Sequence, residues 1–350
     1  MLIVRIIYGI YSFIKNVLKS IYNFLFNFRQ WYNHMLLIIK ENFTEIKYKF
    51  NNLSKANLNL GVHHLMQLNL TDAVIRFKLI DKLIDPSNEQ ANYWLGWSYF
   101  LKNNNDKALY HLNRAGKEDN IGLQAFIVDY ANYSEVPADI WQQYMDIIAK
   151  KWSKINIIED KEIHLSSLFA QCVLRNIDDL PNDYHIFEMG TNIGVIGIEL
   201  RKRFPGNFTL SGIEASKNML STTEQLTYSD KYVYDHLICD SIQNFTDNDL
   251  SAQLLRKKAN IVISFLGFGF TKKLEQYLDF IFSILEYNGY IAFCFAAESA
   301  TSYSMKKKQF VFDKNTIDIF LATKKLVLLE FKEVKLGINN KYYIYILKKL

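Results

Sequence analysis

The C-terminal part of the chain predicts a doubly wound α/β fold with seven strands, the last of which runs antiparallel. Three observations predict it. From residue 184 onward, short β-rich runs alternate with longer amphipathic stretches. A glycine-rich turn follows the first run, where such folds bind a ligand. The last two runs are joined by a connection too short for a crossover helix, between Lys332 and Lys341, which indicates a hairpin.

The elements of this region follow in the order that such a sheet needs. The predicted strands cover residues 184–189, 208–213, 233–239, 261–265, 290–295, 326–330 and 342–347. Helices are expected at 194–204, 216–229, 271–287 and 314–325, with a weaker one at 246–258. Six strands are therefore expected to be parallel, and the seventh antiparallel.

Upstream, residues 51–135 contain a repeated pattern with an offset of 35 residues. Gly61 recurs as Gly96, and Ala73 recurs as Ala108. Small residues at these places let two antiparallel helices approach closely. The pattern is similar to the tetratricopeptide repeat, whose period is about 34 residues. The sequence thus predicts an all-α repeat module before the sheet.

Two such units are fewer than these arrays usually need. Helices at 34–53 and 121–135 are therefore expected to cap them. The module would either bind a protein partner on a concave surface or serve as a structural spacer, and the pattern favours neither.

Residues 1–50 predict one long basic amphipathic helix. Apolar residues recur at alternating spacings of four and three from Ile3 to Ile38, which makes one continuous stripe. Arg5 and Lys15 interrupt the run, so no uncharged stretch of about 18 residues could span a bilayer. Basic and aromatic residues beside the stripe, over residues 1–40, are typical of a helix on an anionic membrane surface. Packing on the next domain or in a coiled coil would use the same stripe.

The formal net charge of +5 lies entirely in residues 1–50, which hold seven Lys/Arg and two Glu. The balanced remainder gives no reason to expect nucleic acid as a partner. Cys172, Cys239 and Cys294 are isolated in apolar stretches, which predicts buried reduced thiols rather than disulfides. The scattered His residues predict no metal site. We therefore expect a cytoplasmic protein, peripheral on the inner face of a membrane if the N-terminal helix binds lipid.

The glycine-rich turn carries the strongest functional signal. It opens with Glu188 and continues through Gly190, Asn192 and Gly194. Glycines let the backbone approach a ligand, and the helix that follows directs its N–H groups at that ligand. Asn192 stands where another glycine is usual, and Asn is the non-glycine residue that best tolerates a left-handed backbone. By itself, such a turn would serve a dinucleotide equally well.

Acids at the ends of the next two strands separate the alternatives. Glu214, followed by Ala215, can accept both ribose hydroxyls of either type of cofactor. Asp240, followed by Ser241, stands where a carboxylate can accept an adenine amino group. Glu188 would repel a pyrophosphate but can orient an amino group. These features favour a nucleoside with an amino-acid tail over a dinucleotide.

Residues 54–350 resemble the bacterial S-adenosylmethionine-dependent methyltransferases of the class I, Rossmann-like type that carry N-terminal tetratricopeptide repeats. Segments 188–194, 212–220, 234–240 and 285–290 carry the resemblance, and 136–144 resembles the helix that precedes the core and covers the cofactor. The resemblance implies a methyltransferase domain at 136–350, with S-adenosylmethionine as cofactor. Its cofactor-contacting residues would be Glu188, Gly190, Asn192, Gly194, Glu214, Ala215, Asp240, Ser241 and Ser264.

The acceptor side is less defined. The segment after the fourth strand, 264–270, lacks an Asn-Pro-Pro-Tyr-type signature and offers no base, so no catalytic residue is assigned. Phe268, Tyr303 and Tyr144 are candidates for the acceptor site, and the lysines at 306–308 would form either an anion-binding or a solvated loop. The acceptor would be a small molecule, a glycan precursor or a protein. The alternative is a repeat-based adaptor with a degenerate methyltransferase scaffold.

Overall fold

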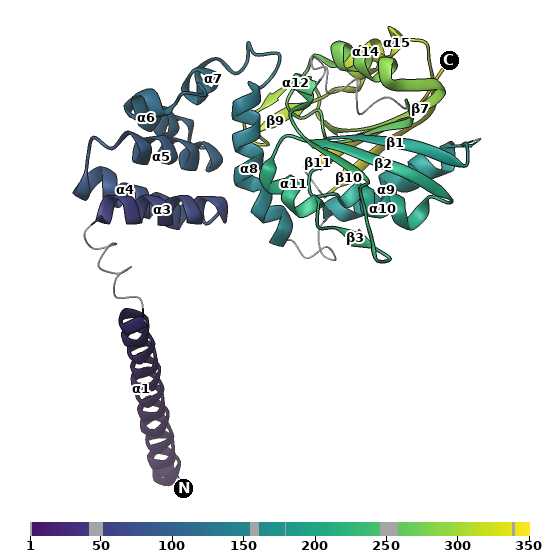
Figure 1. Ribbon diagram of the computed structural model, residues 1–350. Coiled ribbons are helices and arrows are strands. Elements are labelled where there is room, and N and C mark those ends of the chain that lie inside the picture. Colours follow the sequence, from purple (N-terminus) through teal and green to yellow (C-terminus); the bar gives the residue numbers. More distant parts are fainter. Residues whose placement is uncertain (1, 42–51, 155–160, 179, 246–257, 338–339) are drawn as a thin grey trace. The chain divides into compact units, whose positions relative to one another are not determined.

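The computed structural model describes residues 2–41, 52–154, 161–178, 180–245, 258–337 and 340–350 (Figure 1). The chain forms two compact units, Met1–Asn59 and Leu60–Leu350. The first contains α1 (Leu2–Glu41), and the second contains most of the helical module and the whole sheet. Most of the helix predicted at 246–258, and much of the cap predicted at 34–53, lie outside these ranges. No helix of the described ranges is long and apolar enough to cross a membrane.

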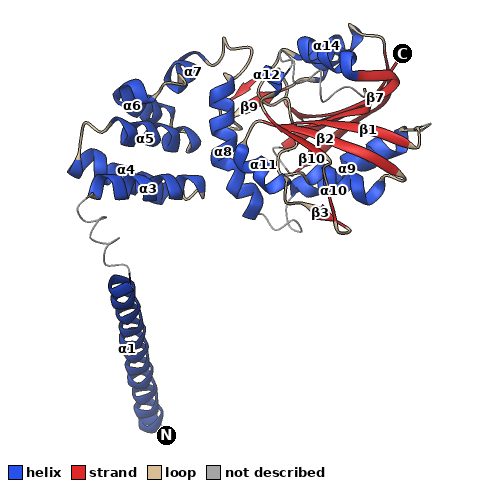
Figure 2. Ribbon diagram, in the orientation of Figure 1, coloured by secondary structure: helices blue, strands red, loops and turns tan. Residues whose placement is uncertain are grey.

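Seven strands form one sheet in the order β10-β11-β7-β6-β1-β2-β5 (Figures 1 and 2). Their bounds are β1 (Asp183–Met189), β2 (Asn207–Glu214), β5 (His236–Cys239), β6 (Ala259–Phe265), β7 (Leu285–Ala297), β10 (Leu326–Leu336) and β11 (Asn340–Lys349). The pairs within β5-β2-β1-β6-β7 are parallel, whereas β11 pairs antiparallel with both β7 and β10. The predicted doubly wound sheet with an antiparallel last strand is confirmed. Its order reverses between β1 and β6, the place where open α/β sheets bind ligands.

Successive side chains of the central strands point to opposite faces of the sheet, and each face packs against a layer of helices. On one face, Phe265 of β6 packs against Phe169 of α9 (Lys161–Asn176), in a core shared with α10 (Val195–Arg203). On the other, Phe293 of β7 contacts Phe268, which in turn contacts Tyr277 of α14 (Leu274–Ile284). Helix α15 (Lys314–Ala322) covers the same face as α14 (Figure 1).

The structure contains two hairpins that the sequence analysis did not predict. The helix expected at 216–229 ends early, as α11 (Lys217–Thr223), and β3 (Thr227–Tyr228) and β4 (Lys231–Tyr232) follow it. Ser229 and Asp230 both have positive φ in the connecting turn, as a tight hairpin requires. The second hairpin, β8 (Ser302–Ser304) and β9 (Gln309–Val311), encloses the lysine run.

The helical module repeats one contact at the offset seen in the sequence. A Cβ built on Gly61 would lie 2.4 Å from a ring atom of Phe77, and one on Gly96 would lie 2.5 Å from Leu112. Gly61 and Gly96 are 35 residues apart, and so are Phe77 and Leu112. The two repeats therefore share this close approach. The module comprises α3 (Leu53–Met66), α4 (Leu70–Leu79), the π-helical turn η1 (Ile80–Ile84), α5 (Glu89–Leu101), α6 (Asn105–Ala115), η2 (Gly116–Glu118) and α7 (Leu123–Asp129). The tetratricopeptide assignment itself stays a prediction.

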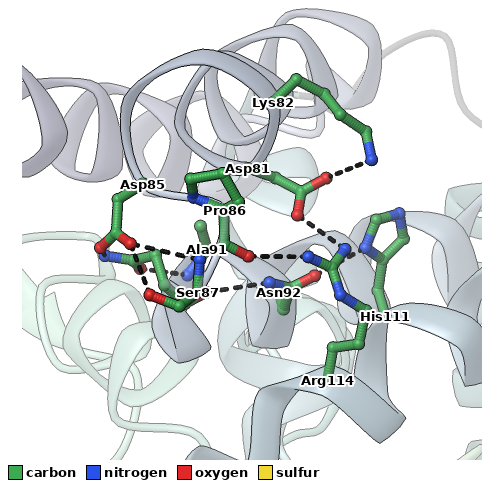
Figure 3. A network of polar contacts seen from close by, with 10 residues as sticks. Asp81, Lys82, Asp85, Pro86, Ser87, Ala91, Asn92, His111 and Arg114 are labelled. Atoms are coloured by element: carbon green, nitrogen blue, oxygen red, sulfur yellow. Dashed lines mark hydrogen bonds and ion pairs between the residues drawn. The ribbon is translucent and has the colours of Figure 1, made fainter.

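A buried ion pair joins the two repeats of the helical module (Figure 3). Asp81 of η1, whose side chain is fully buried, lies 2.7 Å from Arg114 of α6 and 3.1 Å from Lys82. Arg114 also donates to the Pro86 carbonyl at 2.7 Å. Burial opposes ionisation of Asp81, but the bonds to Lys82 and Arg114 outweigh it and lower the pKa of this carboxyl. The network fixes the turn that leads into α5.

Gly96→Ala tests the close helix contact. The added methyl group would overlap Leu112, so we expect a loss of about 1–3 kcal/mol in the free energy of unfolding, measured with urea. This opposes the gain of about 1 kcal/mol that alanine brings to a helix. On a Leu112→Ala background the obstructing atoms are gone, so Gly96→Ala should become neutral or stabilising. An equal effect of Gly96→Ala on the two backgrounds would contradict the contact.

Candidate functional site

The glycine-rich turn leaves β1 in a left-handed conformation. Gly190, Asn192 and Gly194 have φ of 82°, 50° and 78°. Asn192 therefore adopts the conformation for which a glycine is usual, and its side-chain amide donates to the Gly190 carbonyl at 3.1 Å. The backbone N–H groups of Gly190 and Thr191 both donate to Ile213 at the end of β2. The asparagine thus preserves the shape of the turn.

Glu214 lies directly below this turn, at the carboxyl end of β2. Its carboxylate accepts the backbone N–H of Asn192 at 2.8 Å and that of Ser216 at 2.9 Å. The residue is only 3% exposed. Burial raises the pKa of Glu214 to about 7, although these backbone donors oppose the shift. One carboxylate therefore connects the turn after β1 to the loop after β2.

The loop after β6 contacts the same turn through glycines. A Cβ built on Gly267 would lie 2.3 Å from the Met189 carbonyl oxygen, and one on Gly190 would lie 3.0 Å from the Cα of Gly267. Ser264, which is fully buried, donates its hydroxyl to the same Met189 carbonyl at 3.0 Å. This hydrogen bond holds the end of β1 in place. Ser264 is not among the residues that line the neighbouring cavity.

A small cavity of about 30 Å³ lies between these loops and α8 (Ala138–Lys154), which is room for about two water molecules. Trp141 and Met145 of α8 form one wall. The lining residues are Trp141, Met145, Gly190, Asn192, Ile213, Glu214, Ala215, Ile242, Gln243, Leu266, Gly267 and Phe270. Of the predicted cofactor residues, the cavity brings together Gly190, Asn192, Glu214 and Ala215. Most of the region 136–144 belongs to α8, which precedes the sheet and contributes Trp141 to the cavity wall, as expected.

Helix α8 is held over the site by Asp146. The Ser216 hydroxyl donates to the Asp146 carboxylate at 2.6 Å, and the Asn218 backbone N–H donates to it at 3.3 Å. Ser216 is also the N-cap of α11, because its side chain accepts the Met219 N–H. A single serine therefore joins α8 to the loop that carries Glu214.

Glu188, predicted to orient an amino group, is instead bound by another side chain. It is 1% exposed and accepts the Tyr234 hydroxyl at 2.7 Å. Burial raises the pKa of Glu188 to about 8, which the hydrogen bond from Tyr234 opposes. Glu188 is not among the residues that line the cavity, so contact with a cofactor stays a prediction.

Asp240 and Ser241 directly precede the short helix α12 (Ile242–Phe245). Asp240 accepts the side-chain amide of Asn244 at 3.1 Å, and the Ser241 hydroxyl accepts the Asn244 N–H at 3.1 Å. Neither lines the cavity, whereas the next two residues, Ile242 and Gln243, do. The sequence analysis missed these two, because it looked for an acid at the end of the strand and not for side chains of the short helix that follows.

Of the three residues predicted for the acceptor site, Phe268 and Tyr303 are buried in packing contacts. Phe268 is 3% exposed and packs in the core against Phe293, while Phe270 lines the cavity. Tyr303 is buried against Phe126 of α7, and burial raises its pKa. Both therefore pack rather than face the cavity. Tyr144 lies beside Trp141, with ring centroids 5.7 Å apart.

The lysine run is neither a wholly solvated loop nor an open anion site. Lys308 is 4% exposed, and its Nζ lies 3.9 Å from the ring centroid of Phe100 in α5. Within the described part of the chain this ammonium has no hydrogen-bond partner, and burial lowers the pKa of Lys308 to about 8. Its neighbour Phe310 donates its N–H to Gly269 at 2.7 Å. The hairpin thus connects the helical module to the loop after β6.

Among the side chains that the structure describes, no three His, Cys, Asp or Glu come together as a metal site. All three cysteines are free. Cys172 and Cys294 are buried as expected, but Cys239 is exposed at the end of the short strand β5, which corrects its predicted burial.

No protein-family model matches the sequence, and no curated protein matches it either. Among solved structures, the chain is similar to phosphoethanolamine N-methyltransferase 2 of Haemonchus contortus, at 11% identity and a TM-score of 0.45 over 61% of this chain. That match spans only 59% of the length of the nematode enzyme. It is also similar to magnesium protoporphyrin IX methyltransferase of Synechocystis, at 11% identity and a TM-score of 0.43, covering 61% of this chain and 97% of that one.

A third similar structure is the geranyl diphosphate C-methyltransferase of Streptomyces coelicolor, at 10% identity and a TM-score of 0.43, covering 59% of this chain and 98% of that one. All three are methyltransferases. At these levels of similarity, the fold class rests on the strand order of the sheet itself.

The buried Glu188 predicts a pH dependence of stability. Because its folded pKa of about 8 lies above the ordinary value of 4.5, its favourable contribution is complete below about pH 4.5 and is lost as the pH rises through 8. Glu188→Gln cannot ionise. We therefore expect the stability advantage of this variant over the parent to grow by roughly 3–4 kcal/mol between about pH 5 and pH 8, measured with urea. The exposed Glu224→Gln serves as the control, and parallel curves for Glu188→Gln and the parent would refute the assignment.

Proposed function

We propose that the chain is an S-adenosylmethionine-dependent methyltransferase whose cofactor binds on the turn at 190–194. The observation that carries the proposal is the buried Glu214 carboxylate, which lines the cavity directly beside that turn. A carboxylate has about four lone-pair sites, and backbone donors such as Asn192 and Ser216 leave some of them unused. Glu214 can therefore accept ribose hydroxyls while it holds the turn.

The other lining residues fit the rest of such a cofactor. Ile213 and Ile242 offer apolar surface for a purine, and Gly190 lets the backbone approach the ligand. The residues fit in kind, but the present cavity is far smaller than a nucleoside. The side chains of Trp141 and Met145, which line the cavity, would therefore move when the cofactor binds.

The wall formed by Leu266, Phe270 and Trp141 is apolar. Among the lining residues, Glu214 alone is titratable, and ribose binding uses it. When bound, the cofactor supplies an electrophilic methyl group on sulfur. The chain's own residues would then exclude water and align a nucleophile that needs no base, since positioning alone accelerates such a transfer strongly. The acceptor is a small molecule, a glycan precursor or a protein.

A second candidate function is a repeat-based adaptor whose sheet domain is a scaffold. Two observations favour it: the cavity beside Trp141 and Met145 of α8 measures only about 30 Å³, and residues 264–270 include no Asp, Glu, His or Lys. In either case we propose that the helical module is tetratricopeptide-like and recruits a protein partner. Its repeated Gly–aromatic and Gly–aliphatic contacts support the first part of that proposal.

Glu214→Gln separates the two functions. Isothermal titration of S-adenosylhomocysteine into the full chain should show binding by the parent and about 100-fold weaker binding by the variant, because two charge-assisted hydrogen bonds are lost. Glu224→Gln, an exposed acid near the same region, should bind like the parent. Thermal unfolding establishes that each variant is folded. A folded parent that binds no S-adenosylhomocysteine would favour the scaffold.

A further inference from the structure

Helix α1 carries an apolar face that is wider than a coiled coil needs. Three rows of residues, each with a period of seven, begin at Ile14, Val17 and Leu18. Every member of the three rows up to Met35 is aliphatic, aromatic or methionine. All of them are between 38% and 68% exposed. At about 100° per residue, the three rows together span roughly 100° of the helix surface.

The third row argues against pairing with a second copy of α1. A two-stranded coiled coil buries two rows and places charged residues of both signs beside them. Here the row beside the first two consists of Leu18, Leu25 and Tyr32, so pairing would leave it in water. The segment also contains no Asp or Glu between residues 2 and 40 that could pair with the basic residues of a second copy.

The charges next to this face all have one sign. Lys15 and Arg29 occupy the row that borders Leu18 and Leu25, and Lys19 lies one position further round the helix. All three are exposed. Cations beside an apolar face complement anionic lipid headgroups, each contributing favourably near the surface. Trp31 and Tyr32, at the C-terminal part of the face, are of the types that sit at the boundary between headgroups and acyl chains.

We propose that α1 lies flat on an anionic lipid bilayer, with the rows of Ile14, Val17 and Leu18 in the acyl boundary and the three cations at the headgroups. The helix lies on the surface rather than across it, since no described helix qualifies as a span. The proposal is independent of the cofactor site, so either can fail alone.

The test is co-sedimentation of the full chain with vesicles of phosphatidylcholine alone or mixed with phosphatidylglycerol. The parent should bind the anionic vesicles preferentially, and added salt should weaken binding. The charge-reversed variant K15E/K19E/R29E should bind about 100-fold more weakly. Phe24→Ser with Leu25→Ser should also lose binding, because the apolar face is interrupted.

The control variant K117E/K231E/K325E changes the net charge equally at exposed sites of the second unit. It should bind like the parent. Equal losses in both charge variants, or undiminished binding by K15E/K19E/R29E, would overturn the proposal. So would a parent that ignores both vesicles but dissociates from oligomer to monomer, by sedimentation equilibrium, when Phe24 and Leu25 are replaced.

Discussion

A buried carboxylate that accepts backbone N–H groups is the interaction on which the rest of the site depends. Glu214 receives the N–H of Asn192 from the turn after β1 and that of Ser216 from the loop after β2. An ionised group is costly to bury unless such donors compensate it. Because its partners are backbone atoms, their positions depend on the ends of both strands, and the carboxylate in turn fixes the left-handed conformation of Asn192.

The surrounding contacts extend this constraint to the helical module. Glycines at 190 and 267 bring the turn and the loop after β6 into backbone contact. The segment between α7 and α8 joins that loop, since Val136 donates its N–H to Phe270 and Lys272 donates to Ser134. The hairpin β8–β9 adds a further connection through Phe310 and Gly269. The segment that links the helical module to α8 therefore shares backbone hydrogen bonds with the wall of the candidate site.

Local rules explain what the sequence could and could not predict. The turn, the strand-end acid Glu214 and the antiparallel β11 follow from glycine positions, strand periodicity and a short connection, which are readable in one segment at a time. The partner of Glu188 was not predictable, because Tyr234 is distant in sequence and reaches it only through packing. Lys308 looked like a solvated charge, yet the hairpin that buries it has strands of only three residues and weak periodicity. Tyr303 lies in the same hairpin, whereas Phe268 is buried by Phe293 and Phe295 of β7, which are distant in sequence.

The central claim is that Glu214 is about half protonated at pH 7 in the free chain and must ionise to accept ribose hydroxyls. Binding of S-adenosylhomocysteine should then release close to one proton at about pH 6 and almost none at about pH 8.5, since the pKa of Glu214 is about 7. Calorimetric titrations in two buffers of different ionisation enthalpy measure this number directly, and Glu188→Gln controls for the neighbouring acid. Release of close to one proton at about pH 6, falling almost to none at about pH 8.5, would support the claim. Binding without proton release at about pH 6 would contradict it.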